Sequence, residues 1–246
     1  MYNVNNVPVK DLVKRGISVK INGFQKMTLL DYPGKVACTV FTGGCNFRCP
    51  FCHNAALVEG LGDEISENEV FAFLEKRKGL LDGVCITGGE PLLQPDIAEF
   101  ISKVREMGYA VKLDTNGSFP LRLKELAKQG LIDYAAMDVK NCPEKYSITA
   151  GCEHISFSDV EESIDFLING SISYEFRTTV VKEFHTVSDI EKLAESIKGA
   201  KRYFLQYFAD SGSLLSEGLH PADKETMEKM RSAALLHVSS AEIRGG

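Results

Sequence analysis

Short apolar runs alternate along the chain with longer segments in which apolar residues recur every three or four positions. Short runs rich in β-branched, aromatic and other apolar residues favour buried strands, whereas the second spacing is typical of amphipathic helices. Helical segments separate the strand candidates, which is the order expected of βα units built on a parallel sheet. The pattern predicts six strands, at residues 36–41, 83–87, 110–114, 134–138, 173–180 and 202–208.

The predicted helices carry recognisable start and stop signals. Ser66, Ser158 and Ser188 are each followed three residues later by Glu, a spacing that predicts capping boxes at three helix starts. Asp96 is expected to open a further helix, which Gly108 should close. Three more glycines stand where helices should end in a left-handed residue: Gly130, Gly170 and Gly199.

Six βα units fall short of the eight in a closed barrel, so the expected fold class is α/β with an open partial (β/α)6 barrel. Residues 1–35 form an N-terminal extension in which 19–24 is a candidate extra strand. The barrel covers 36–208, and a C-terminal segment, 209–246, carries a final helix near 221–237, all within a single domain of ordinary length. A doubly wound sheet would give the same linear pattern. The choice between the two folds therefore depends on the site motifs.

The composition narrows the class of partners. The chain has 246 residues, of which 44% are hydrophobic and 25% charged, with a net charge of -6, as in ordinary globular proteins. It contains no long Lys/Arg tract to neutralise phosphates, so nucleic acid is not an expected partner. Residues 1–20 resemble neither a signal nor a transit peptide, and the longest apolar runs are too short to span a bilayer. We therefore expect a cytoplasmic protein without a membrane partner.

Three of the seven cysteines fall within eight residues, directly after the first strand and the pair Gly43-Gly44. An odd count in a chain without export signals argues against a disulfide framework. Cys45, Cys49 and Cys52 have the spacing C-x3-C-x2-C. Three thiolates in one loop can hold three irons of a cubane cluster and leave the fourth iron open to a substrate.

The cysteine loop could also be a structural zinc site or a chance cluster of buried thiols. A structural zinc site normally has four ligands in paired knuckles, but here only His53 lies nearby and no second knuckle follows. Chance clustering of buried cysteines would not account for the preceding strand and glycines. The spacing and its context therefore favour a [4Fe-4S] cluster bound by Cys45, Cys49 and Cys52.

With these residues in place, the chain resembles the radical S-adenosylmethionine (SAM) superfamily. The stretch 23–54, GFQKMTLLDYPGKVACTVFTGGCNFRCPFCHN, is similar to glycyl-radical-enzyme activases, and in detail to the activating proteins of anaerobic ribonucleoside-triphosphate reductase. The resemblance extends to about Phe208. It implies a single radical SAM domain with catalysis at the three cysteines and SAM as the cosubstrate.

The resemblance also implies a SAM site at the ends of the predicted strands, where parallel α/β folds place their sites. After the second strand, Gly88 and Gly89 would let the backbone approach SAM, and Glu90 would accept a hydrogen bond from its amino group. Alone, Gly-Gly-Glu-Pro is also a good turn. Its place one βα unit after the cysteine loop favours the SAM role.

The next two strand ends carry further candidates. In the activases, residues matching Asn116, Asp138 and Lys140 contact SAM or a nearby monovalent cation, so the resemblance implies that these residues bind SAM. It also implies Asp114, Thr115 and Asp138 as ligands of such a cation. The alternative is ordinary strand-end polarity, because Asp-Thr-Asn-Gly is a competent turn and Lys140 could be solvated.

Three residues complete the implied SAM site. Arg177, on the fifth strand, would bind the SAM carboxylate, or else pair on the exterior with Glu175 or Glu183. Gln206 interrupts the apolar pattern of the sixth strand and would line the same cavity, although alternation alone would place a polar residue there. Phe51 would pack near the adenine, or simply fill the core.

The resemblance implies a reaction as well. Reduction of the cluster by an external donor, a flavodoxin or ferredoxin, would cleave SAM to methionine and a 5′-deoxyadenosyl radical. That radical would remove a hydrogen atom from a glycine of a partner glycyl radical enzyme. A radical SAM enzyme acting on a small molecule or another peptide is the second interpretation, and a structural zinc-binding interaction module is the third.

Overall fold

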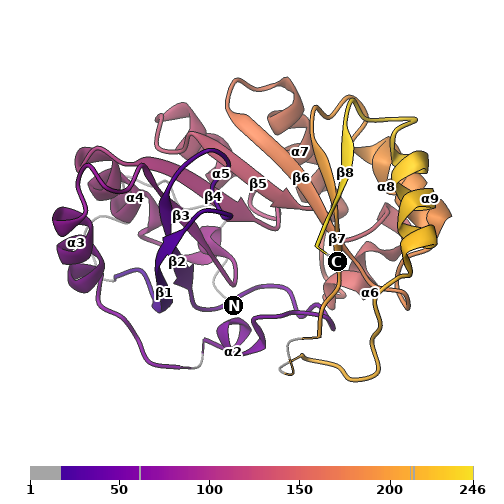
Figure 1. Ribbon diagram of the computed structural model, residues 1–246, viewed down its shortest axis with the longest axis horizontal. Helices are drawn as coiled ribbons and strands as arrows, with labels where there is room; N and C mark the ends of the chain where they lie inside the picture. The colour runs from indigo at the N-terminus through magenta and orange to yellow at the C-terminus, as the bar shows by residue number, and fades with distance from the viewer. Residues whose placement is uncertain (1–17, 61, 211, 213, 246) are drawn as a thin grey trace. The chain divides into compact units, whose positions relative to one another are not determined.

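The computed structural model is an α/β protein whose strands follow one another in the sheet in their chain order, from β1 to β8 (Figure 1). It describes residues 18–60, 62–210, 212 and 214–245, so residues 1–17 of the predicted N-terminal extension lie outside the described part. β1 and β8 are the edge strands of the sheet. The α/β class with an open sheet is confirmed, with one strand more at each end than the six predicted βα units.

The described residues form eight strands: β1 (Ile21–Thr28), β2 (Ala37–Thr42), β3 (Gly83–Gly88), β4 (Ala110–Thr115), β5 (Tyr134–Asp138), β6 (Ser173–Val180), β7 (Tyr203–Tyr207) and β8 (Ala241–Arg244). The helices are α2 (Ala55–Val58), α3 (Glu67–Lys76), α4 (Ile97–Glu106), α5 (Pro120–Lys128), α6 (Tyr146–Ala150), α7 (Phe157–Asn169), α8 (Val187–Ser196) and α9 (Lys224–Ala234), with short 3-10 helices η2 (Pro91–Leu93) and η3 (Pro143–Lys145). None of these helices combines the length and the apolar character needed to cross a membrane.

By its internal contacts the chain divides into two compact units. The first contains residues 18–46, 56–115 and 121–135, and the second contains 47–55, 116–120 and 136–245. The boundary falls within β5 and within the cysteine loop. The prediction that the chain is one domain stays a prediction.

In the first unit, β1 pairs antiparallel with β2, and β2, β3 and β4 are parallel. A turn joins β1 to β2, in which the Lys35 N–H donates to the Tyr32 carbonyl at 3.1 Å. Pro33 fixes its own φ, and Gly34 supplies the positive φ of 73° that such a turn requires. α4 buries its apolar stripe because these residues recur at helical spacing: Ile97, Phe100, Ile101 and Val104.

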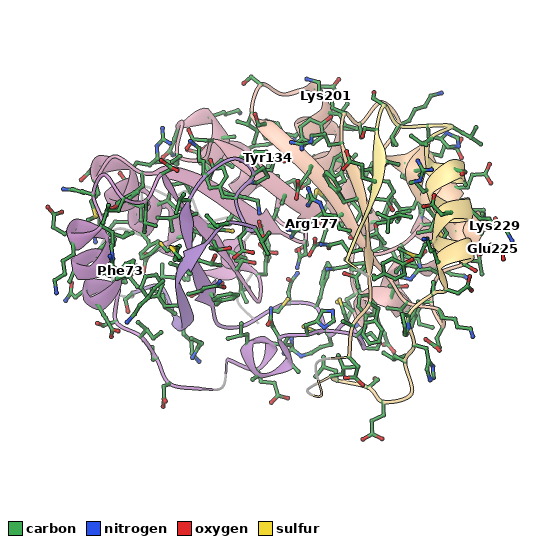
Figure 2. All side chains as sticks on the ribbon, viewed as in Figure 1. Phe73, Tyr134, Arg177, Lys201, Glu225 and Lys229 are labelled. Atoms are coloured by element: carbon green, nitrogen blue, oxygen red, sulfur yellow. The ribbon has the colours of Figure 1, made fainter. Side chains whose placement is uncertain are left out.

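In the second unit, β6, β7 and β8 are parallel, and α8 packs against α9 (Figure 1). Figure 2 shows Glu225 and Lys229 on α9, and their side chains form an exposed i,i+4 ion pair. β8 was not predicted, because its four residues are too few and too polar to stand out as a strand. The Arg244 guanidinium holds it by donating two hydrogen bonds, at 3.0 and 3.1 Å, to the buried Glu175 carboxylate of β6.

Asp96 opens α4, as predicted, although its side chain makes no capping bond. Of the three predicted capping boxes, the one at Ser66 is confirmed in part: Ser66 caps α3 by accepting from the Glu69 N–H at 3.2 Å. The other two are wrong in detail. α7 begins earlier than predicted, after Ser156, and no side-chain capping bond forms there. At α8 the capping box is formed by Thr186 and Asp189 rather than by Ser188, because Thr-Val-Ser-Asp offers the same spacing two residues earlier.

Three of the four glycines predicted to end helices do so in the left-handed conformation, and one does not. Gly108, Gly130 and Gly199 have φ of 93°, 67° and 85°, which confirms left-handed helix ends. Gly170 is the exception, because it follows α7 with φ −86° and ψ −177°, an extended conformation. The chain leaves α7 directly towards β6 rather than through a left-handed turn.

Substitution of Thr186 by alanine should lower the free energy of unfolding by about 1 kcal/mol, the usual effect of losing a side-chain cap. The Thr186 hydroxyl accepts from the Asp189 N–H at 3.2 Å and donates to its carboxylate at 2.7 Å, and alanine removes both bonds. Urea denaturation of the two proteins measures the difference. Ser156→Ala is the matched control, because Ser156 makes no capping bond, and an equal loss there would contradict the assignment.

Candidate active site

The cysteine loop follows β2 and contains the three candidate cluster ligands. Cys45 and Cys52 are half-buried and Cys49 is buried, with 8% exposure, and none of the seven cysteines is in a disulfide. The Cys52 N–H donates to the Cys49 carbonyl at 3.0 Å, which makes a tight turn between these two residues. Among the residues that the structure describes, no three His, Cys, Asp or Glu side chains are grouped as ligands of a metal ion. The cluster assignment therefore rests on the spacing and stays a prediction.

In the first unit, the end of β3 lies directly against the start of the cysteine loop. The Glu90 N–H donates to the Gly44 carbonyl at 2.9 Å. A Cβ on Gly89 would lie 2.0 Å from the same carbonyl oxygen, so only glycine allows this approach. The motif Gly88-Gly89-Glu90 is thus joined to Gly44, the residue before Cys45.

The Glu90 carboxylate is fully buried and held by neighbouring donors. It accepts from the Leu92 N–H at 3.0 Å, capping η2, and from the Thr115 hydroxyl at 2.9 Å. Buried carboxylates normally require such partners. These bonds fix the side chain at the carboxyl ends of β3 and β4, the position predicted for it, while its contact with SAM stays a prediction.

Asp114, predicted as a cation ligand, lies beside a lysine that no sequence motif singled out. The Lys112 ammonium forms an ion pair with Asp114 and lies 3.8 Å from the Cys85 thiol, although Lys112 is only 1% exposed. The strand pattern held a signal for this, because residues two apart on a strand share a face. The Lys112 ammonium thus occupies a place beside the Asp114 carboxylate where a cation would bind. The predicted cation site at Asp114 and Thr115 stays a prediction.

In the second unit, Asp138 lies between two cations. Arg177, labelled in Figure 2, donates from Nε to the Asp138 carboxylate at 2.8 Å, and the Lys140 ammonium donates to it at 3.2 Å. Burial alone would raise the pKa of Asp138, but the Arg177 and Lys140 charges outweigh it and hold the pKa well below its usual range. Three of the predicted SAM residues therefore form one ion-pair network.

Lys140 also acts on the cysteine loop, since Cys49 lies in the same unit. Burial raises the pKa of the Cys49 thiol to about 11, and the Lys140 ammonium opposes this rise. A cation placed here favours the thiolate over the thiol. This charge fits a metal ligand, because metals bind cysteine as the thiolate.

The other predicted SAM residues have neighbours of their own. Asn116 is buried, and its side-chain oxygen accepts from the N–H and the hydroxyl of Ser118, at 3.0 and 2.6 Å. Gln206 is half-buried on β7. Phe51 packs against the rings of Phe184 and His185, at 5.8 and 6.4 Å, so part of its role is to fill the core. Their contacts with SAM stay predictions.

His53, the nearby residue that could have completed a zinc site, stacks on Phe208. Their ring centroids are 5.6 Å apart with an interplanar angle of 24°. Burial lowers the pKa of His53. The His53 ring therefore has a packing role that requires no metal ion.

His185 has no ligand spacing in the sequence, which predicts a surface or satisfied residue, and the structure shows a buried, satisfied one. Its Nε2 lies 2.8 Å from the Lys140 carbonyl oxygen, and its Nδ1 lies 3.0 Å from the Val181 nitrogen and 3.1 Å from the Val181 carbonyl oxygen. Backbone groups thus lie within hydrogen-bond distance of both ring nitrogens. The ring therefore joins the segments that follow β5 and β6, beside Phe51.

Stability should fall as the pH drops below about 6.5, the pKa of an unfolded histidine. Burial lowers the pKa of His185, while its two backbone partners and Asp189 oppose the shift and Lys145 adds to it. The unfolded chain therefore binds the extra proton first, and the free energy of unfolding declines by up to about 1.4 kcal/mol per pH unit.

Urea denaturation between pH 7.5 and 5.0 measures this slope. His185→Gln should reduce it, because glutamine does not titrate. The exposed His154 offers the matched control, and His154→Gln should keep the wild-type slope. A wild-type slope in His185→Gln would show that another group causes the acid sensitivity.

Comparison with known proteins adds to this geometry. A family model described as the radical SAM superfamily matches residues 39–207. A protein of Methanocaldococcus jannaschii named glycyl-radical enzyme activating enzyme is 34% identical over 193 residues, which cover 76% of this chain and 79% of that protein. A pyruvate formate-lyase-activating enzyme of Clostridium pasteurianum is 28% identical over 190 residues, covering 74% and 77%. A 7-carboxy-7-deazaguanine synthase of Thermoplasma acidophilum is 29% identical over 181 residues, covering 68% and 82%.

Solved structures share the fold at lower identity. A domain of pyruvate-formate lyase-activating enzyme from Bacteroides vulgatus has a TM-score of 0.53 at 16% identity, covering 66% of this chain and 99% of that domain. Streptococcus suis SuiB bound to S-adenosylmethionine has a TM-score of 0.65 at 13% identity, covering 82% of this chain and 48% of the other. These likenesses concern the fold alone, and they agree with the open partial barrel.

Proposed function

Because the chain belongs to the radical SAM superfamily, we propose that this enzyme is an activase that generates a glycyl radical on a partner enzyme. The observation that carries the proposal is the relative named glycyl-radical enzyme activating enzyme, which aligns over 79% of its length. Enzymes of the superfamily use a [4Fe-4S] cluster and SAM. When bound, the two together supply a 5′-deoxyadenosyl radical.

Cys45, Cys49 and Cys52 would hold the cluster. Their chemistry fits, because three cysteines within eight residues, none of them in a disulfide, match three irons of a cubane and leave one iron for SAM. The Lys140 ammonium near Cys49 favours the thiolate form that iron requires. Gly44, held by the Glu90 N–H, fixes the backbone before Cys45.

The residues at the strand ends would orient SAM. Glu90 would accept from the SAM ammonium with a carboxylate that the Leu92 N–H and the Thr115 hydroxyl already hold in place. The absence of side chains at Gly88 and Gly89 would let SAM approach the backbone. In the second unit, the Arg177 guanidinium would bind the SAM carboxylate, with Asp138 and Lys140 setting its position and charge. The remaining predicted SAM contacts are Phe51, Asn116 and Gln206.

Anaerobic ribonucleoside-triphosphate reductase is the partner that we propose, with reduced flavodoxin or ferredoxin as the electron donor. The proposal is supported by the stretch 23–54, which resembles the activating proteins of that reductase across the cysteine loop. A cytoplasmic location is part of the proposal, because such donors and reductases act there.

A second candidate is a radical SAM enzyme acting on a small molecule. The relative named 7-carboxy-7-deazaguanine synthase favours it, since this chain aligns with 82% of that protein at 29% identity. The activase proposal has the stronger support, at 34% identity over a similar share of the relative. The two candidate functions differ in whether a partner protein or a small molecule reacts with the radical.

The test uses the full chain, reconstituted anaerobically with iron and sulfide and reduced with dithionite in the presence of SAM. Iron, sulfide and 5′-deoxyadenosine are measured first. Purified anaerobic ribonucleoside-triphosphate reductase is then added, and electron paramagnetic resonance records any glycyl radical. The Cys49→Ala variant is the control that should give neither product.

We expect about four irons per chain, 5′-deoxyadenosine, and a glycyl radical signal that appears only with the reductase. Iron and 5′-deoxyadenosine without a radical on the reductase would overturn the proposed partner. Turnover of a small molecule without any protein partner would favour the second candidate. Zinc in place of iron would overturn the proposal as a whole.

A further inference from the structure

Tyr146, in the second unit, carries a buried hydroxyl group. Tyr146 opens α6 and is 1% exposed, and its hydroxyl meets no hydrogen-bond partner among the residues that the structure describes. An unpaired buried hydroxyl is costly, so such groups usually mark a place where a partner is missing. The backbone N–H of Lys140 faces the hydroxyl oxygen, but as a donor it could bind only a lone pair of that oxygen and not the hydroxyl proton. The hydroxyl proton would still lack an acceptor.

α6 is docked on the cysteine loop, which places Tyr146 beside it. The Arg48 N–H donates to the Ala150 carbonyl at the end of α6, at 2.9 Å. Gly151 follows with φ 61°, and a Cβ there would lie 2.0 Å from the Arg48 carbonyl oxygen, so the two backbones are in direct contact. The rings of Phe47 and Tyr146 meet edge to face, with centroids 6.4 Å apart. Phe47 and Arg48 are the two residues that precede Cys49.

Two groups that can carry a negative charge act on Tyr146, Cys49 and Asp138, and the Asp138 carboxylate already accepts from Arg177 and Lys140. Burial raises the pKa of Tyr146, and although Lys140 opposes the shift, the hydroxyl keeps its proton at neutral pH. The Cys49 thiol is close enough to act on Tyr146 and on Lys140. As a thiol, Cys49 is a weak acceptor, but a thiolate bound to iron is a strong one.

We propose that the Tyr146 hydroxyl donates a hydrogen bond to the Cys49 thiolate when that cysteine binds the [4Fe-4S] cluster, and so raises the reduction potential of the cluster. The inference rests on the proposed function and names a positioning residue for it. Hydrogen bonds to cluster sulfurs set the potential because they stabilise the more negative, reduced cluster. Tyr146 acts through Cys49 and takes no part in the chemistry at SAM.

The test compares Tyr146→Phe with Tyr203→Phe. Tyr203 is also fully buried in the second unit, but its hydroxyl already donates to the Thr178 hydroxyl at 2.8 Å. Each variant is reconstituted anaerobically, its iron is counted, and its cluster is titrated against potential with electron paramagnetic resonance as the readout. The melting temperature of each cluster-free variant is measured in parallel.

Tyr146→Phe should load iron fully and shift the midpoint potential to more negative values. At a fixed potential the ratio of reduced to oxidised cluster should fall about tenfold, equivalent to about 59 mV for one electron. Tyr203→Phe should leave the potential unchanged. Without the cluster, Tyr146→Phe should melt at or above the wild-type temperature, because it removes an unpaired hydroxyl, whereas Tyr203→Phe should melt lower.

An unchanged potential in fully loaded Tyr146→Phe would overturn the inference and leave the proposed function intact. A lower melting temperature of cluster-free Tyr146→Phe would also overturn it, since the hydroxyl would then have a partner before the cluster binds. A wild-type chain that binds no iron would overturn the proposed function itself, and the inference with it.

Discussion

Replacing Cys45, Cys49 or Cys52 by alanine is expected to abolish both cluster binding and SAM cleavage. Each cysteine would bind one iron of the cubane, and a cluster with only two protein ligands is not retained. The 5′-deoxyadenosine yield should fall to about one per cent of the wild-type value or less, since the bound cluster would supply the electron for SAM cleavage. Iron analysis, visible absorption and the 5′-deoxyadenosine assay measure the effect.

Cys152→Ala is the matched control. Cys152 is a half-buried free thiol in the same unit as Cys49 and Cys52, but it lies outside the C-x3-C-x2-C spacing. This variant should keep wild-type iron content and activity. Wild-type iron and cleavage in any one of the three loop variants would remove that cysteine from the ligand set.

Asp138→Asn is expected to give the largest change in stability among the strand-end substitutions. Asparagine keeps the shape of the side chain but removes the negative charge that the Arg177 and Lys140 cations, 14% and 18% exposed, meet at Asp138. Breaking such a pair should lower the free energy of unfolding by about 2 kcal/mol, less than for a fully buried pair, because a third of Asp138 is exposed. Urea denaturation at pH 7 measures the loss.

The pH dependence provides a second check on Asp138. Because its pKa is lowered in the folded chain, its contribution is complete above the unfolded value of about 3.9 and is lost as the pH falls below it. Asp138→Asn should therefore flatten the stability curve below pH 4 and leave the histidine slope near pH 6 unchanged. Glu144→Gln, which breaks the exposed pair with Lys192, should match the wild type. Equal losses in the two variants would contradict the network.

The strands were predictable because each is a compact apolar run. β5 and β6 match their predicted bounds of 134–138 and 173–180, and β1 overlaps the candidate at 19–24 but begins at Ile21 and ends at Thr28. β8 could not be predicted, because Ala241–Arg244 holds two charged residues in four and depends on Arg244 reaching the buried Glu175. The capping box at Thr186 was missed because two overlapping Ser/Thr signals compete, and local sequence does not decide between them.

The candidate site was predictable where its chemistry lies in one short segment. Cys45, Cys49 and Cys52, and the motif ending at Glu90, are visible as spacing and composition. Tyr146 and His185 were not, because their roles depend on which backbone groups the tertiary fold brings to them. An orphaned hydroxyl has no signature in a sequence.

The order of the strands has a consequence for synthesis on the ribosome. In each unit a new strand pairs with the one that emerged before it, as β3 does with β2 and β8 does with β7. Among the described strands, none has to be inserted between two that are already paired. The sheet can therefore lengthen at one growing edge while the chain is translated. No early strand has to wait unpaired for a distant one, a state that slows folding and exposes the chain to aggregation.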